Sequence, residues 1–473
     1  SNVDNRTTMS SLLNVKYLFV RANQVGKAKV PYGFKIVRNK QGKPKLFSNR
    51  SVYKLDNQSG TALYRNQYAL PLAYTQTQQL DRNAFFKLSA NNREQALLDG
   101  ALTDHQLTGV KTVKAGTVTH PVAYSVKMHY QPFTTVAQAM AYRLKHDTSE
   151  SVTGKIKAKK LTPKQVRKND KKAKTSKPSQ AVMKLLHQNR GIVERNNQAN
   201  RHGLKELTSD KLGQNADYTV TLKNPSAYKN CELYMEFDGI KAQFPSTSDR
   251  LNNTANRSLM ADVPFSPGAR LNYWRNFTKK PGFDAFNLVV KSPNRSEIIQ
   301  QLPINNMSDY EKKDQSLVNL GYSKQARKTI KVSFTGAKRL SFKRVRIIAV
   351  PFDQNYRQKT TQLQSQTLKQ LRVTNNRVSG ATNQPRASVL TTSIPYTTGW
   401  QLTVDGRHTP IQKVNNGFVG AKLPAGRHQI RLTYRTPGLS AGRWLSAIGL
   451  ILFVFGTAVE VWRWLGRKQV TKH

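Results

Sequence analysis

The fold class is decided by a stretch near the C-terminus, residues 387–434, which reads ASVLTTSIPYTTGWQLTVDGRHTPIQKVNNGFVGAKLPAGRHQIRLTY. Apolar and polar residues alternate here in short runs, as expected for β-strands with one buried face. The runs are residues 388–395, 400–404, 411–414, 418–423 and 429–434. Asp405-Gly406, Asn416-Gly417 and Ala425-Gly426 stand between several of them, and each pair supplies a turn residue that tolerates a positive φ. We therefore predict a small antiparallel β unit over residues 371–438.

An apolar segment follows this β unit directly, at residues 439–464. Its uncharged part, residues 444–459, reaches with its flanks the roughly 20 residues that cross a bilayer. Trp444 and Trp464 stand where interfacial aromatic residues belong, and a basic tail, residues 465–473, follows. A buried helix of a soluble core is the alternative. We predict one transmembrane helix with, by the positive-inside rule, a cytoplasmic tail, and with the rest of the chain on the extracytoplasmic side of the cell membrane.

The first half of the chain mixes helical and strand patterns. We predict an α+β unit over residues 1–131, because the apolar run at residues 12–20 favours a buried strand and residues 83–100 have helical spacing that ends at a glycine. Residues 132–203 differ in kind. They indicate a basic, partly helical insertion, with helical patterns at residues 134–146 and 179–189.

The following region, residues 204–370, is rich in short β runs. They lie between segments of Pro, Gly, Asn and Ser, which is typical of a jelly-roll-like β-sandwich. The expected strands are residues 218–222, 231–237, 286–290, 331–334 and 343–350. A polar, Gln-rich stretch at residues 353–371 favours a helix that begins at an acceptable cap. The fold class that these patterns predict is α+β, mainly β.

Charge and composition limit the partners. The chain has 473 residues and a formal net charge of +51, from 77 Lys and Arg against 26 Asp and Glu. Charged residues make up only 22%, so the imbalance comes from missing acids as much as from added bases. A hydrophobic share of 37% is enough to build cores and excludes wholesale disorder. The charge indicates a polyanionic neighbour, which is a nucleic acid, an anionic membrane surface or a phosphate-rich wall polymer.

The most basic segment is residues 155–177, with eleven Lys or Arg and a single acid, Asp170. A solvated basic insertion explains this segment, and a contact with phosphates or lipid head groups is the functional alternative. No aromatic residue is interleaved for base stacking, which together with the membrane helix argues against nucleic acid as a partner. The candidate polyanion-binding residues are Lys159, Lys160, Lys164, Arg167, Lys168, Lys171 and Lys172.

No strong catalytic motif is present, since the chain has no phosphate-binding glycine loop, no nucleophile elbow and no HExxH. We therefore predict no catalytic residue, no metal and no cofactor within it. His408 and His428 lie close in the last β unit, but a metal there needs a third ligand, and the nearest candidate, Asp405, already has a turn position. The single cysteine, Cys231, excludes an internal disulfide and favours a small buried apolar side chain.

Two groups of side chains are candidates for carbohydrate recognition. Glu232, Glu236 and Asp238 alternate along an expected strand and share one face. We expect an exposed face balanced by Lys and Arg, with a sugar or cation site as the alternative. Aromatic rings stack on the apolar faces of sugars, and the candidates are Trp274, Tyr396 and Trp400. A core position in its own β unit is the alternative for the last of these.

Several motifs together resemble a known family. The run SLLNVKYLFV at residues 11–20 is one, and VNLGYSK at residues 318–324 is a weaker one. SIPYTTGWQLTVDGR at residues 393–407 and FVGAKLPAGRHQIRLTYRTPG at residues 418–438 precede the apolar segment. This combination resembles the extracytoplasmic end of the bacterial YfhO-type membrane proteins and covers most of the chain.

The resemblance implies a function that composition and spacing do not. Such proteins resemble multi-pass glycosyltransferases of the GT-C type in Gram-positive bacteria, which move a sugar from undecaprenyl phosphate to lipoteichoic acid or a related wall polymer outside the cell. Their catalytic carboxylate belongs to a loop between early membrane helices, so no catalytic residue is carried over to this chain. We expect an outer region and last anchor that binds or positions the acceptor, with catalytic residues upstream. A non-enzymatic, membrane-anchored wall-binding or adhesion protein is the alternative.

Overall fold

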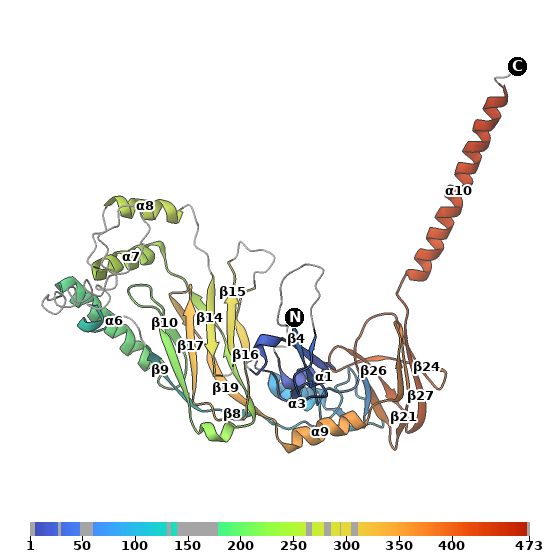
Figure 1. Ribbon diagram of the computed structural model, residues 1–473, viewed down its shortest axis with the longest axis horizontal. Helices are drawn as coiled ribbons and strands as arrows, with labels where there is room; N and C mark the ends of the chain where they lie inside the picture. The colour runs from blue at the N-terminus through green and yellow to red at the C-terminus, as the bar shows by residue number, and fades with distance from the viewer. Residues whose placement is uncertain are drawn as a thin grey trace.

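The computed structural model describes residues 5–26, 30–47, 60–129, 134–139, 178–261, 267–278, 285–293, 295–303 and 311–470. Antiparallel sheets dominate this part of the chain, and a long apolar helix projects from its end (Figure 1). The predicted fold class, α+β and mainly β, is confirmed. The basic residues of 155–177 lie outside the described residues, as does an alternating segment at residues 51–55.

A β-sandwich forms the middle of the molecule. One of its two antiparallel sheets contains, in spatial order, β15 (Ser296–Gln301), β14 (Phe286–Lys291), β17 (Thr329–Thr335), β11 (Asp217–Leu222) and β9 (Tyr124–His129). The other contains β16 (Gln315–Ser323), β12 (Cys231–Asp238), β19 (Arg344–Pro351) and β8 (His120–Pro121). The five strands expected in this region are confirmed. The strand alternation that the sequence displays is what lets each sheet present one apolar face to the other.

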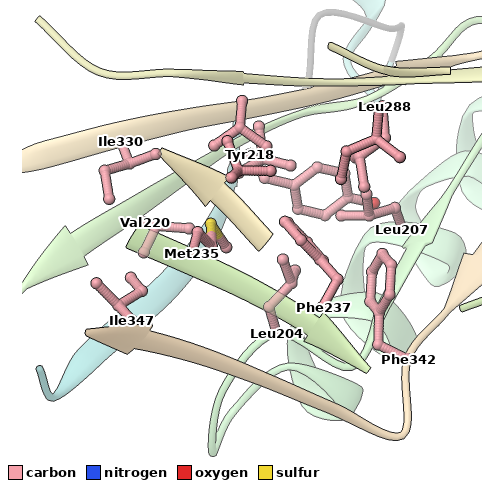
Figure 2. Packing of buried hydrophobic residues seen from close by; sticks show 14 of the residues in the cluster. Leu204, Leu207, Tyr218, Val220, Met235, Phe237, Leu288, Ile330, Phe342 and Ile347 are labelled. Atoms are coloured by element: carbon pink, nitrogen blue, oxygen red, sulfur yellow. The ribbon is translucent and has the colours of Figure 1, made fainter. Parts of the chain in front are cut away.

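The sandwich core lies between these sheets and is closed at one end by a small sheet of β10 (Glu206–Thr208), β18 (Arg339–Ser341) and β13 (Lys241–Gln243). In Figure 2 Phe237 and Met235 of β12 point toward side chains of the facing sheet and of the loops. The Phe237 and Phe342 rings lie 5.2 Å apart. Cys231 is buried in this core, as expected.

Helices flank the sandwich on one side. Ser179 caps α6 (Gln180–Ala199) by accepting a hydrogen bond from the Val182 N–H, and the helix runs on well past its expected end at residue 189. Two further helices, α7 (Thr247–Ala261) and α8 (Pro267–Thr278), were not expected. The pattern at residues 134–146 is described only as far as residue 139, where residues 136–139 are helical.

The N-terminal part begins with a helix, α1 (Thr7–Leu12), and a small antiparallel sheet, β1 (Tyr17–Arg21), β4 (Thr61–Asn66), β2 (Phe34–Ile36) and β3 (Leu46–Phe47). The expectation of a buried strand at residues 12–20 is wrong in two respects. Leu12 ends a helix, and Tyr17 and Phe19 are 48% and 67% exposed. A short apolar run does not distinguish helix from strand, and only one face of this sheet is covered.

Two short helices and several small elements complete this part. The helical spacing at residues 83–100 is confirmed, and it forms two short helices, α2 (Arg82–Lys87) and α3 (Ala90–Ala96). The other elements are the 3-10 turn η1 (Ala22–Gln24) and the parallel pair β6 (Gln78–Leu80) and β7 (Lys111–Val113). A second 3-10 turn, η2 (Pro225–Tyr228), lies in the sandwich between β11 and β12.

The C-terminal β unit packs two sheets against each other. One sheet contains, in spatial order, β20 (Lys369–Val373), β21 (Arg377–Gln384), β27 (Gly426–Tyr434), β23 (Trp400–Val404) and β24 (Arg407–Thr409). The other contains β25 (Gln412–Val414), β26 (Phe418–Leu423), β22 (Ser388–Pro395) and β5 (Ala73–Gln76). The five expected strands are confirmed, and β21 was missed. The edge strand β5 comes from the N-terminal part of the chain and pairs with β22. The helix expected within residues 353–371 is confirmed as α9 (Gln354–Ser365), which Asp353 caps. It is shorter than expected.

Helix α10 (Leu439–Val470) leaves this unit on the upper side in Figure 1. Within the described residues it is the one helix long and apolar enough to cross a membrane, with a mean hydropathy of 2.0 in its best window over Leu439–Leu465. None of that window is buried, which excludes the alternative of a core helix in this structure. The side of the membrane on which each end lies stays a prediction.

Candidate functional site

A groove of about 770 Å³ lies where the N-terminal sheet meets one end of the sandwich. Its walls come from segments far apart in the sequence: the turn before β2, the end of β4, the end of β16 and the start of α9. Its lining includes four aromatic and four basic residues, namely Tyr32, Tyr68, Tyr322, Phe352, Lys35, Lys229, Lys324 and Arg357. Aromatic rings and cations are thus interleaved along one concave surface.

Tyr32 is the centre of the aromatic cluster. Its ring stacks with that of Tyr68 at a centroid distance of 5.4 Å and an interplanar angle of 9°, and with that of Phe352 at 5.0 Å and 24°. Tyr322 lies 4.9 Å away at 53°. Each of the three tyrosines is half-buried, so the cluster is held by ring packing while part of its surface faces the groove.

The backbone around Gly33 permits this stacking. Gly33 has φ +82°, and a Cβ placed there would stand 2.4 Å from Cδ2 of the Tyr68 ring. Only glycine therefore fits between the turn and the ring. The Tyr68 N–H donates a hydrogen bond of 2.9 Å to Oδ1 of Asn66, which fixes the other partner of the stack.

Tyr322 is positioned from the sandwich side by its own hydrogen bond and by contacts of the backbone next to it. Its hydroxyl donates to Oδ1 of Asn230 at 3.1 Å. The buried Arg327 guanidinium donates to the carbonyl oxygens of Gly321 at 2.6 Å and of Cys231 at 2.8 Å, which ties the end of β16 to β12. Burial lowers the pKa of Arg327 to about 10, so the group stays charged at neutral pH.

A buried carboxylate supports the groove from beneath. Glu232 is 1% exposed and accepts hydrogen bonds from the Thr7 hydroxyl and from the Tyr234 hydroxyl, both at 2.6 Å. The same Thr7 oxygen accepts the backbone N–H of Tyr32 at 3.0 Å. Burial raises the pKa of Glu232, partly offset by these hydrogen bonds. Glu232 therefore positions Tyr32 through Thr7 and is not itself open to the groove.

This burial corrects the expectation of three carboxylates on one exposed face. Glu236 and Asp238 are half-buried and pair with arginines of β19, Glu236 with Arg346 at 2.7 Å and Asp238 with Arg344 at 3.1 Å. For these two, the expected balance by Lys and Arg is confirmed. Glu232 lies at the other end of β12, where α1 covers the sheet, and strand alternation alone does not reveal such a cover.

The groove is electrostatically positive. Lys35, Lys229, Lys324 and Arg357 are exposed along it. The acid beside them, Asp353, accepts the Tyr356 N–H at 3.1 Å as the cap of α9. Ammonium and guanidinium groups bind phosphate oxygens, and tyrosine rings stack on sugars. The arrangement suits a ligand that carries both.

The aromatic residues proposed from the sequence lie elsewhere, and the structure does not bring all three together. Trp274 is 41% exposed on α8 beside the sandwich. Tyr396 is 37% exposed just after β22, with the Lys413 ammonium 5.7 Å from its ring centre. Trp400 packs on Tyr434 at 5.1 Å in the C-terminal unit. Their role in carbohydrate binding stays a prediction, as does that of the seven basic residues from Lys159 to Lys172, which lie outside the described residues.

Sequence reasoning missed the groove, although one signal was available. The VNLGYSK motif contains both Tyr322 and Lys324, which are an aromatic and a basic residue two positions apart on β16 and its end. Two positions along an extended chain point to the same face. The partners from residues 32, 68 and 352 carry no comparable signal, because they meet only in the folded chain.

The Asp405 and His428 side chains form a turn contact. Asp405 has φ +50°, its Oδ2 lies 2.6 Å from Nδ1 of His428, and its Oδ1 accepts the Gln429 N–H at 2.7 Å. These contacts raise the pKa of His428 and lower that of Asp405. Among the described residues no group of three metal-binding side chains occurs. The pair locks the β23–β24 turn onto β27.

Comparison with known proteins gives a family match. The family described as "Bacterial membrane protein YfhO" matches residues 1–446. A curated relative, "Uncharacterized protein YfhO" of Bacillus subtilis (strain 168), is 30% identical over 107 residues, which is 22% of this chain and 12% of that protein. The chain thus matches only a small part of that relative's length.

Cryo-EM structures of the arabinofuranosyltransferase AftD from Mycobacteria are similar in part. One mutant structure is 13% identical and covers 36% of this chain and 13% of that chain, with a TM-score of 0.14. Another structure is 9% identical and covers 49% and 21%, also with a TM-score of 0.14. Scores this low do not define a common fold.

Proposed function

The chain belongs to the YfhO family of bacterial membrane proteins, and from that premise we propose that it is the extracytoplasmic, acceptor-binding part of a membrane glycosyltransferase. The enzyme transfers a sugar from undecaprenyl phosphate to lipoteichoic acid or a related wall polymer. Its catalytic residues belong to membrane-embedded parts of the protein other than the chain described here. The groove around Tyr32 holds the acceptor polymer.

The observation that carries this proposal is the chemistry of the groove. A teichoic acid alternates phosphates with polyol or sugar units, and the groove alternates exposed cations with tyrosine rings. Each phosphate that a Lys or Arg neutralises releases counterions, so binding of this kind weakens steeply as salt rises. The excess of 77 basic over 26 acidic residues supports a polyanionic ligand.

Binding to purified lipoteichoic acid tests the groove. The full chain in nanodiscs is compared with a Tyr322→Ala/Lys324→Ala variant at low and at several-fold higher salt. We expect the variant to bind at least about tenfold more weakly at low salt, since stacking of one ring and one phosphate contact are both lost. Wild-type affinity is expected to fall strongly at high salt.

The matched control is Phe86→Ala/Lys87→Ala, which removes an exposed aromatic and basic pair from α2, outside the groove. We expect this control to retain wild-type affinity. Salt-independent binding, or equal loss in both double variants, contradicts the proposed acceptor site.

Transfer itself is tested in cells. Deletion of the gene is expected to remove the sugar from the wall polymer, and the full-length protein with Tyr322→Ala/Lys324→Ala is expected to restore it less than wild type. Unchanged glycosylation in the deletion strain, with no second family member present, contradicts the transferase and favours the non-enzymatic wall-binding alternative.

A further inference from the structure

The outer face of the N-terminal sheet carries aromatic and basic side chains together. Residues directly opposite each other on neighbouring strands share one side of a sheet. Tyr17 and Lys35 are both opposite Arg65. Arg21 and Phe47 are both opposite Thr61, four positions before Arg65 on β4 and so on the same side. Phe19, opposite Leu63, lies on this side too. The face defined by Tyr17, Phe19, Arg21, Lys35, Phe47 and Arg65 is called the aromatic-basic face below.

This face is open, whereas its reverse is packed. The reverse side buries Val20, Phe34 and Tyr64 in a small cluster. On the aromatic-basic face Phe19 is 67% and Tyr17 48% exposed, and Phe47 is 39% exposed beneath the Lys45 ammonium, 5.3 Å from its ring centre. Large apolar side chains gathered in this way on a solvent-facing sheet mark an interaction surface.

The sequence around this face is strongly basic, and Asp56, in the connection between β3 and β4, is the one acid between residues 5 and 66. Residues 5–55 contain twelve Lys or Arg and no Asp or Glu, and β4 adds Arg65 without an acid. Within the sheet no carboxylate is available to neutralise Arg21 or Lys35. The partner must therefore supply negative charge as well as an apolar layer into which rings insert.

We propose that the aromatic-basic face lies against the anionic lipid surface of the bilayer that α10 enters. Aromatic side chains flanked by Lys and Arg are the composition that settles at the boundary between head groups and acyl chains. In Figure 1 β4 lies above α3 and α9, on the side toward which α10 leaves the molecule. A polymer ligand fits the recessed groove, whereas Phe19 is 67% exposed on the sheet and does not line that groove.

The contact has a structural consequence for the groove. Strand β2 follows the Tyr32 turn immediately, and Lys35 of β2 lies both on the aromatic-basic face and at the rim of the groove that Tyr32 lines. A sheet resting on the bilayer therefore holds the groove at a set height above the membrane. This inference does not require sugar transfer, and it stands or falls separately from the proposed function.

The test places a spin label at residue 19. Cys231 is the only cysteine and is buried, so Cys231→Ala with Phe19→Cys gives a single labelled site. The full chain is reconstituted in phosphatidylcholine bilayers with or without phosphatidylglycerol. Access of the label to oxygen and to a water-soluble nickel complex is then measured.

The matched control is Ile298→Cys on the sandwich edge strand β15, where the native side chain is 61% exposed. We expect the label at 19 to be shielded several-fold from the nickel complex in bilayers with phosphatidylglycerol, and less with phosphatidylcholine alone. The label at 298 is expected to stay accessible in both. Adding Arg21→Gln and Arg65→Gln is expected to abolish the shielding at 19.

Three results overturn the proposal. One is equal nickel access at 19 and 298 in the anionic bilayers. Another is shielding at 19 that persists in detergent without lipid, which assigns the face to a protein partner or a second copy. The third is shielding that soluble lipoteichoic acid displaces, which assigns it to the polymer. Tyr17→Cys, on the same face, serves as a second position if labelling at 19 disturbs the sheet.

Discussion

The β-sandwich and the N-terminal sheet treat their charges in opposite ways. Around the sandwich, carboxylates meet cations in pairs, namely Glu236 with Arg346, Asp238 with Arg344, Glu206 with Arg339 and Asp249 with Lys338. The N-terminal sheet has cations and no acids. Pairing neutralises a surface, whereas unpaired cations leave a field for an outside anion. This difference in charge is consistent with the proposed roles, in which the sandwich is the scaffold and the N-terminal sheet and the groove bind anionic partners.

The two regions also differ in how they are stabilised. The sandwich buries one continuous apolar core between two sheets, whereas the N-terminal sheet buries the small cluster of Val20, Phe34 and Tyr64. The same residue type therefore has different roles in each. Phe237 is fully buried in the sandwich, and Phe19 is 67% exposed. Five predictions, in order of expected size, follow from this division.

The largest effect is expected from a core truncation. Phe237→Ala should lower the free energy of unfolding of the sandwich by about 3–5 kcal/mol, because it removes a buried ring and leaves a cavity. Phe19→Ala should change it by no more than about 0.5 kcal/mol. Urea unfolding of the full chain in nanodiscs measures both. Similar losses would contradict the assignment of stability to the sandwich.

The two glutamates of β12 give the next largest contrast. Glu232→Ala leaves the hydroxyls of Thr7 and Tyr234 without their acceptor, and each buried group without a partner costs about 1–3 kcal/mol. Glu236→Ala removes a half-exposed pair with Arg346, worth about 0–1 kcal/mol. The same unfolding measurement compares them. Equal losses would mean that α1 does not seal this end of the sheet.

The pH dependence of the same site follows from its raised pKa. A carboxyl with a higher pKa in the folded chain stabilises most below its unfolded value, near 4.5, and this contribution is lost as pH rises through the folded pKa. We expect the urea concentration at the unfolding midpoint to change less with pH above pH 4.5 in the Glu232→Gln variant than in the wild type. An unchanged profile in that variant would show that other groups cause the dependence.

A smaller effect is expected within the groove. Gly33→Ala places a Cβ against the Tyr68 ring, and the positive φ adds about 1 kcal/mol of backbone strain. Gly42→Ala has nearly the same φ, +75°, with nothing within 4 Å, and so isolates the strain. Only the Gly33 variant should bind lipoteichoic acid more weakly in the titration used for Tyr322. Equal binding by both variants would remove Tyr68 from the proposed site.

The smallest effect is expected at the turn lock of the C-terminal unit. Because the pKa of His428 is raised in the folded chain, this residue contributes to the stability of the fold below pH 6.5. The contribution is lost as pH rises through the pKa that His428 has in the folded chain. Because the pKa of Asp405 is lowered in the folded chain, this residue contributes to stability above pH 3.8, and the contribution is lost as pH falls through its pKa in the folded chain. Thermal unfolding of His428→Ala should therefore differ most from wild type between pH 3.8 and 6.5. His408→Ala, at an exposed position of β24, should match wild type.

Local patterns were sufficient for the C-terminal strands and the membrane helix. The strands over 388–395, 400–404 and 418–423 agree with the structure residue for residue, because period-two alternation and turn residues act over a few positions. The apolar length of α10 is likewise a property of one continuous segment. The family resemblance rests on the same local motifs and is confirmed by the match over residues 1–446.

Contacts between distant segments decided the rest. Thr7 and Glu232 are 225 positions apart, yet their hydrogen bond turns an expected surface acid into a buried support for Tyr32. The groove, the pairing of β5 with β22 and the exposure of Phe19 arise in the same way. Alternation shows that a strand has two faces but not which surface, if any, covers each of them. That choice depends on the free energy of burial between whole units, which no short stretch of sequence contains.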